Sequence, residues 1–151
     1  MLFTGSYEIS IDSKNRLAIP SEIRNRLDPQ RDGEAIYAMV GPDRYLCLYT
    51  ESEFEKLAEN LGDPSMPPEK LRNYKRMLFS LSHRLELDSQ GRIRLPKVLI
   101  DVTKLERKII LAGVGDHIEL LNHTDWDTQL AEMTNERADL MIMPSEAMNI
   151  G

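Results

Sequence analysis

The sequence IDSKNRLAIP at residues 11–20 recurs as LDSQGRIRLP at residues 87–96, an offset of 76 residues. Further along, LCLYTESEF at 46–54 matches IELLNHTDW at 118–126 with an offset of 72, so the second copy lacks four residues between its two motifs. The missing residues correspond to the polar stretch 28–33, where a loop would tolerate a change of length. Internal similarity of this kind indicates two copies of one structural unit in the chain.

The start of each copy has the periodicity of a half-buried strand. Apolar and polar residues alternate over 7–12 in the first copy and over 83–88 in the second. A tight turn follows, and its fourth position is Asn15 or Gly91, two residue types that readily accept a positive φ angle. A second strand is expected directly after each turn.

Pro20 and Pro96 stop strand pairing and can occupy the first turn of a short helix. Two further hairpins and three longer helices follow from the periodicity and the capping residues. The predicted hairpins pair 36–40 with 45–49 and 108–112 with 117–121, and the predicted helices span 51–61, 69–82 and 123–138. The sequence therefore predicts an α+β protein made of two β-hairpin units of βαββ order.

Charge is distributed unevenly along the chain. The net charge of −6 and the pI near 5.1 disfavour phosphate binding when they are taken as averages. The segments 1–26, 27–68, 69–108 and 109–151, however, carry net charges of +1, −6, +6 and −7. Such segregation can place a positive surface for DNA on an acidic body. A solvated charged helix at 69–76 would explain part of the +6 without any ligand.

The repeated Asp-x-x-x-Arg motif has a structural and a functional interpretation. Asp12 with Arg16 and Asp88 with Arg92 flank the tight turns, so their side chains can meet as structural ion pairs, which stabilise little when exposed. The functional interpretation adds contacts to DNA, because a two-stranded ribbon fits the major groove, where Arg binds guanine and Asn or Gln binds adenine. The residues predicted to contact base edges are Lys14, Asn15, Arg16, Gln90, Arg92 and Arg94.

These two motifs, together with MLFTG at residues 1–5, resemble the MraZ family, and the resemblance extends to about residue 140. Each half of that family is similar to an AbrB-type swapped-hairpin DNA-binding unit. The resemblance implies a pseudo-symmetric double AbrB-like β-barrel with peripheral helices. It divides the chain into a first unit with its helix at 1–61, a connector loop and helix at 62–82, a second unit with its helix at 83–143, and a tail at 144–151.

The same resemblance implies a transcriptional regulator of the division and cell-wall gene cluster. Such a protein would bind direct repeats in double-stranded DNA near its own promoter, assemble into a homo-oligomeric ring, and act in the cytoplasm at the nucleoid. In AbrB-like proteins the turn arginine and one arginine on the next helix contact DNA, which carries over to Arg16 and Arg24. Two departures are visible, since Ile100 stands at the position equivalent to Arg24 and Asn15 replaces the usual Gly. AbrB-like units also serve in antitoxins, so a protein-interaction module is the alternative function.

The remaining candidate sites are weaker. Cys47 has no neighbouring thiol and is expected to be a small core residue, and His83, His117 and His123 have no ligand at metal-site spacing. No Gly-x-Ser-x-Gly turn and no Gly-rich phosphate loop is present, and the longest apolar stretch, 109–112, is too short to span a membrane. We therefore expect a DNA-binding protein that is not an enzyme and uses no cofactor, metal, membrane or small-molecule substrate.

Overall fold

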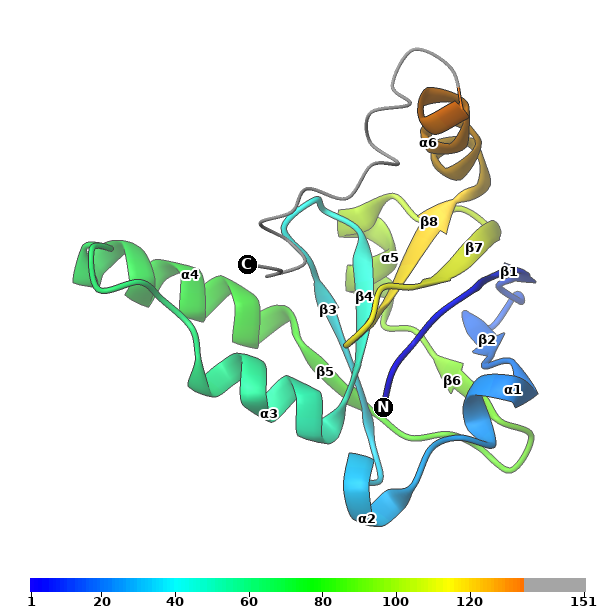
Figure 1. The fold of residues 1–151 in the computed structure, drawn as a ribbon, viewed down its shortest axis with the longest axis horizontal. Helices are drawn as coiled ribbons and strands as arrows, with labels where there is room; N and C mark the ends of the chain where they lie inside the picture. The colour runs from blue at the N-terminus through cyan, green and yellow to red at the C-terminus, as the bar shows by residue number, and fades with distance from the viewer. Residues whose placement is uncertain (135–151) are drawn as a thin grey trace, which may run out of the picture.

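The computed structural model describes residues 1–134. Its strands form one six-stranded antiparallel sheet and a separate two-stranded ribbon, and helices pack on both faces of the sheet (Figure 1). In chain order the elements are β1 Ser6–Ser10, β2 Arg16–Ala18, α1 Ser21–Arg24, α2 Pro29–Asp32, β3 Ile36–Val40, β4 Leu46–Thr50, α3 Glu51–Glu59, α4 Pro68–Leu81, β5 His83–Leu85, β6 Arg92–Arg94, α5 Lys97–Thr103, β7 Lys108–Gly113, β8 Ile118–Asn122 and α6 His123–Thr134.

The two copies of the repeat exchange strands. The sheet order is β1-β7-β8-β4-β3-β5, so β1 of the first copy pairs with β7 of the second, and β5 of the second copy pairs with β3 of the first. Strands β4 and β8 meet at the centre, and the predicted hairpins β3–β4 and β7–β8 are confirmed. The two copies therefore form one interlocked body, as expected for swapped hairpins.

The six-stranded sheet is open, so the predicted closed barrel is not confirmed. Strands β1 and β5 lie at opposite edges of the sheet, and no strand of the described residues joins them. The strands that follow the two tight turns, β2 and β6, are only three residues long and pair with each other instead. Each ends shortly before a proline, Pro20 or Pro96, which has no N–H group to extend a ladder. The strands before the turns pair elsewhere too, β1 with β7 and β5 with β3, so neither turn closes a self-paired hairpin.

The helices begin close to the predicted positions. Thr50 caps α3, because its hydroxyl accepts a hydrogen bond from the backbone N–H of Glu53 at 3.3 Å. Helix α4 is shifted by one residue from the expected range, and the predicted residues 135–138 of the last helix and the tail 144–151 lie outside the described residues. The polar stretch that was expected to be a loop contains the short helix α2, which is capped by Asp28.

The core has a layer on each face of the sheet. On one face, the sheet packs against the β2–β6 ribbon and the short helices α1 and α5, and the fully buried residues of this layer include Leu17, Ile93, Leu46, Leu111 and Leu120. On the other face, a second cluster joins β3 and β4 to α3 and α4, and a third joins β7 and β8 to α6. The ribbon and helix α4 therefore lie on opposite faces of the sheet.

Candidate nucleic-acid interface

The first tight turn is organised by the carboxylate of Asp12. One of its oxygens, Oδ1, accepts hydrogen bonds from the backbone N–H groups of Lys14 at 2.9 Å and Arg16 at 2.8 Å. The other, Oδ2, accepts from the Nε atom of Arg16 at 2.8 Å. These donors, the backbone N–H of Arg16 first, hold the pKa of Asp12 at about 2. The turn therefore presents an arginine whose direction is fixed by a carboxylate.

The second turn repeats this geometry with Asp88. Its Oδ1 atom accepts from the backbone N–H groups of Gln90 at 2.8 Å and Arg92 at 2.9 Å, and its Oδ2 atom accepts from the Nε atom of Arg92 at 2.9 Å. The hydrogen bond from the backbone N–H of Arg92 is the main reason that the pKa of Asp88 is lowered. Both structural ion pairs expected from the sequence are present.

The fourth position of each turn adopts the expected left-handed backbone. The φ angle is 61° at Asn15 and 75° at Gly91, and both residues donate their backbone N–H to the carbonyl of the turn aspartate. Asparagine tolerates this region better than most residues, so the turn survives the replacement of glycine. The side chains of Lys14 and Gln90, one residue earlier, are exposed on the two turns.

The ribbon gathers three of the predicted arginines. Arg16 of β2 lies opposite Arg94 of β6, and Arg92 lies opposite Ala18. Between these pairs, Leu17 and Ile93 are 1% exposed and anchor the ribbon to the core. Because side chains alternate along a strand, the arginines lie on the face that points away from the core. The side chain of Arg94 is exposed, whereas those of Arg16 and Arg92 are 25% and 27% exposed.

The guanidinium groups of Arg16 and Arg92 keep donors for a ligand. Among the described residues, each of these side chains makes one hydrogen bond, which its Nε atom donates to the turn aspartate. The two Nη atoms at the end of each side chain carry the remaining N–H donors. An arginine held in this way can still bind an acceptor pair end-on, the arrangement that guanine O6 and N7 require.

Arg24 lies over the turn of the other copy. Its Nε atom donates to the carbonyl oxygen of Ile19 at 2.8 Å, and its side chain packs against Gly91 of the second turn. The expected helix arginine therefore also has a structural task, because it links α1 to the turn that carries Arg92. Its side chain remains partly exposed beside that turn.

Arg107 is a residue of this region that sequence reasoning missed. It donates to the carbonyl oxygen of Asp12 and to the Oδ1 atom of Asn15, the latter at 3.2 Å, and so holds the first turn from the second copy. This contact uses the amide oxygen of Asn15, which a bidentate contact to adenine would also need. No local motif could have revealed a partner 92 residues away.

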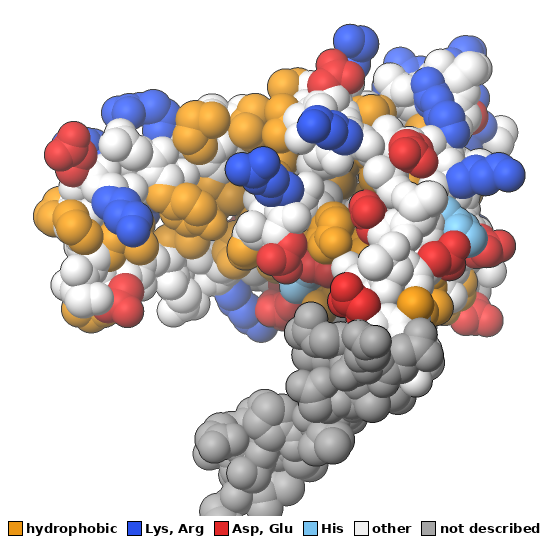
Figure 2. Space-filling view, turned by 90° about the horizontal axis from the view of Figure 1, so that it is seen from above, with side chains coloured by type: hydrophobic (Ala, Val, Ile, Leu, Met, Phe, Trp, Pro, Cys, Tyr) orange, Lys and Arg blue, Asp and Glu red, His pale blue; other side chains and the backbone are white. Residues whose placement is uncertain are grey.

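The basic segment 69–108 does not form one surface. Four of its basic residues lie on α4, on the opposite face of the sheet from the ribbon: Lys70, Arg72, Lys75 and Arg76. This part of the +6 therefore belongs to a charged helix away from the ribbon, which is the alternative that the sequence left open. Figure 2 shows Lys and Arg side chains both on the arm that contains α4, at the left, and at the other end of the body. The positive charge near the turns comes from the ribbon and its surroundings, with Lys14, Arg24 and Arg107 beside the three ribbon arginines.

None of the helices among the described residues is both long and apolar enough to cross a membrane.

Known proteins with similar sequences agree with the repeat. The model of a family described as "MraZ protein, putative antitoxin-like" matches residues 2–74 and 78–142. A transcriptional regulator MraZ of Mycoplasmoides gallisepticum is 36% identical over 135 residues, which cover 89% of this chain and 88% of the relative. One of Thiobacillus denitrificans is 32% identical over 131 residues, which cover 87% of this chain and 88% of the relative. The chain therefore belongs to the MraZ family.

Proposed function

We propose that this protein is a sequence-specific DNA-binding transcription regulator that contacts DNA through the β2–β6 ribbon and its two turns. The observation that carries the proposal is the ribbon itself, a two-stranded antiparallel element with Arg16, Arg92 and Arg94 on its outer face. A ribbon of two strands fits the major groove of B-DNA. The relatives named transcriptional regulators support this assignment.

Within this interface the arginines and the polar turn residues have different tasks. Arg16 and Arg92, preoriented by Asp12 and Asp88, would bind guanine with their Nη atoms, and each such contact discriminates by about 1–3 kcal/mol. Arg94, Lys14 and Gln90 are exposed and can reach phosphates or base edges. Arg24 lies beside the second turn and Asn15 lies within the first, and their present contacts compete with a contact to DNA. No step of covalent chemistry is needed for this function.

The finer parts of the proposal concern the target and the assembly. We infer that the DNA target consists of direct repeats upstream of the division and cell-wall gene cluster, and that several copies of the chain form a ring. The arm at α4 suits contacts between copies, because Tyr74, Met77 and Phe79 are 45%, 58% and 38% exposed. Figure 2 shows apolar surface on the arm at the left. DNA binding at these repeats would place the protein at the nucleoid.

The experiment that tests the proposal measures binding of the full chain to DNA from upstream of its own gene. Fluorescence anisotropy should show that the chain binds this DNA at least tenfold more tightly than an unrelated duplex of equal length. Each good arginine contact to guanine favours the correct base on the order of 10- to 100-fold, and two such contacts are proposed. Equal affinity for both duplexes would contradict sequence-specific recognition. An absence of DNA binding would instead favour the antitoxin-like alternative, in which the chain binds a protein partner.

A further inference from the structure

Three side chains that can ligate a metal come together on the central strands of the sheet. Cys47 of β4 lies directly opposite Glu119 of β8, and His117 immediately precedes β8. The Sγ atom of Cys47, one imidazole nitrogen of His117 and one carboxylate oxygen of Glu119 all lie within 4.8 Å of one another. These residues are far from both turns in the sequence, and Cys47 and His117 are separated by 70 positions, so spacing along the chain did not indicate the cluster.

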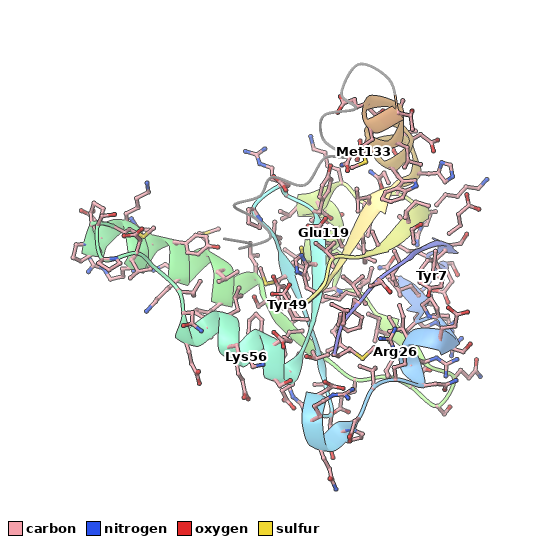
Figure 3. All side chains as sticks on the ribbon, viewed as in Figure 1. Tyr7, Arg26, Tyr49, Lys56, Glu119 and Met133 are labelled. Carbon is pink, nitrogen blue, oxygen red and sulfur yellow. The ribbon has the colours of Figure 1, made fainter. Side chains whose placement is uncertain are left out.

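The imidazole of His117 is held in the orientation of a metal ligand. Its Nδ1 atom is 2.7 Å from the Oδ1 atom of Asp116, and its ring stacks on Tyr49 with a centroid distance of 4.8 Å and an interplanar angle of 11°. A hydrogen bond from Nδ1–H to a carboxylate leaves the lone pair on Nε2, the usual arrangement around histidine ligands. Tyr49 and Glu119, both labelled in Figure 3, lie on the two central strands that frame this ring.

The Nε2 atom of His117 faces a second carboxylate. It lies 3.5 Å from the Oε2 atom of Glu119, so two groups that accept hydrogen bonds face each other unless the ring gains a second proton or a cation lies between them. The Sγ atom of Cys47 is on the same side, in a position where only 1% of the residue is exposed. The thiol donates to the carbonyl oxygen of Tyr45 at 3.6 Å, and a cation at this point would replace the thiol proton and lie between the imidazole and the carboxylate.

We propose that Cys47, His117 and Glu119 bind a borderline-soft divalent cation of the zinc type. One sulfur, one imidazole nitrogen and one carboxylate oxygen form a mixed donor set that zinc accepts and that calcium and magnesium do not prefer. Asp116 accepts a hydrogen bond from Nδ1, the ring nitrogen of His117 that does not bind the ion. A water molecule completes the tetrahedral coordination. A cation at this place would connect the two copies of the repeat at the centre of the sheet.

The geometry requires only small movements. Ligand atoms of a tetrahedral zinc site lie about 2.0–2.3 Å from the ion and therefore about 3.5 Å from one another. The Nε2 and Oε2 atoms already have this separation, and rotation of the Cys47 and Glu119 side chains can close the remaining distances. Burial raises the pKa of the Cys47 thiol to about 12 in the absence of an ion, and a coordinated zinc ion deprotonates a thiol outright.

An entry path exists on the side of Glu119. The side chains of His117 and Glu119 are 16% and 21% exposed, and Glu119 also lines a surface hollow beside Trp126 and Gln129 of α6. An ion can therefore reach the two exposed ligands first and then the buried thiol. The site lies on strands β4 and β8 and shares no residue with the ribbon, so this inference does not depend on DNA binding.

The test uses the full chain, purified without a histidine tag and freed of metal with a chelator, and titrated with Co²⁺ as a spectroscopic substitute for Zn²⁺. We expect one equivalent of Co²⁺ to bind, with the sulfur-to-cobalt charge-transfer band and the visible bands of tetrahedral coordination. Excess Zn²⁺ should displace Co²⁺ and abolish both the charge-transfer band and the visible bands. Cys47→Ser should remove the charge-transfer band, and Glu119→Gln should weaken binding at least tenfold.

Two further variants separate the site from general effects. Asp116→Asn should weaken Co²⁺ binding roughly 10- to 100-fold, the usual effect of losing a partner of a ligating histidine. His83→Gln, which changes a histidine of β5 outside the cluster, should leave binding unchanged. If Cys47→Ser fails to fold by circular dichroism, the partly exposed Glu119 still provides the decisive variant.

The proposal is overturned if no stoichiometric Co²⁺ binding occurs, or if binding is equal in the wild type and Glu119→Gln. It is also overturned if NMR shows a doubly protonated His117 ring in the presence of Zn²⁺.

Discussion

Arg24 and Gly91 belong to different copies of the repeat, yet a Cβ atom on Gly91 would lie 2.5 Å from the Nε atom of Arg24. The helix arginine of the first copy is therefore packed directly on the turn of the second. At the equivalent turn of the first copy, Asn15 replaces glycine and Ile100 replaces the arginine. The two departures from the family pattern therefore occur together, and Arg107, instead of a helix arginine, contacts the first turn.

The first prediction concerns Gly91→Ala. Alanine at a φ angle of 75° is strained and its Cβ atom would displace Arg24, so we expect the free energy of unfolding to fall by about 1–3 kcal/mol. Urea denaturation measures this change. Asn15→Gly, at the corresponding position of the first turn, should be much milder because the backbone there already has a positive φ angle.

A double variant separates the two causes of this destabilisation. Shortening the arginine in Arg24→Ala removes the clash and leaves the backbone strain, so Gly91→Ala should cost less in that background than in the wild type. Equal costs in the two backgrounds would show that Arg24 does not restrict the turn.

The second prediction concerns the turn arginines. Arg16→Ala and Arg92→Ala should each weaken specific DNA binding by roughly 1–3 kcal/mol while the fold is retained, because each removes one proposed contact to a base. Affinity is measured by anisotropy, and folding by circular dichroism and thermal unfolding.

Asp12→Asn is the matched control for Arg16→Ala. An asparagine can keep the two backbone hydrogen bonds through its Oδ1 atom but loses the charge that orients the arginine. If Arg16→Ala lowers the melting temperature and the DNA affinity no more than Asp12→Asn does, the arginine has only a structural task.

Most of the local structure could be predicted, because it depends on residues that are close in the sequence. The positive φ angles at Asn15 and Gly91 follow from residue type, and the cap at Thr50 follows from its spacing to Glu53. The partners of each strand could not be obtained from periodicity, since alternation marks a buried face but not the strand beside it. The swapped arrangement was implied by the family resemblance, whereas the separate pairing of β2 with β6 could not be foreseen from the sequence.

In the candidate site, too, the contacts between residues close in the sequence could be predicted, and the contacts between the two copies could not. The Asp12–Arg16 and Asp88–Arg92 pairs are local and were predicted, and they are present with equal geometry in both turns. The contact from Arg107 to Asn15 and the packing of Arg24 on Gly91 cross between copies, so only the folded chain reveals them. The DNA contacts themselves remain a prediction.

The third prediction is a loss of stability in acid that depends on Asp12. Its pKa is about 2 in the folded protein and about 3.9 in an unfolded chain, so its contribution is complete above the unfolded value and is lost as the pH falls toward 2. The difference in urea midpoint between the wild type and Asp12→Asn should therefore shrink between about pH 5 and pH 3. Asp43→Asn, in the connection between β3 and β4, controls for the removal of one negative charge. A difference that stays constant over this range would contradict the lowered pKa.

The fourth prediction is strong salt dependence of DNA binding despite the net charge of −6. The logarithm of the association constant should fall linearly with the logarithm of salt concentration, with a slope of about −0.9 for each neutralised phosphate. If Lys14 contacts a phosphate, Lys14→Ala should reduce the slope by about 1. Lys75→Ala, on α4 and on the opposite face of the sheet, should leave the slope unchanged. A flat slope for the wild type would remove the electrostatic basis of the proposed function.

The last prediction concerns the spacing of the DNA repeats. One ribbon offers few side chains to base edges, and contacts worth about 1–3 kcal/mol each discriminate too little to select one site in a genome. Several copies in a ring can contact adjacent repeats together, because the first contact raises the effective concentration of the others. Repeats about 10 base pairs apart face the same side of the duplex, so inserting about half a helical turn between them should lower affinity sharply, and inserting a full turn should lower it less. Anisotropy with the altered duplexes measures this difference. Equal affinity for a single isolated repeat and for the intact array would show that one ribbon binds alone.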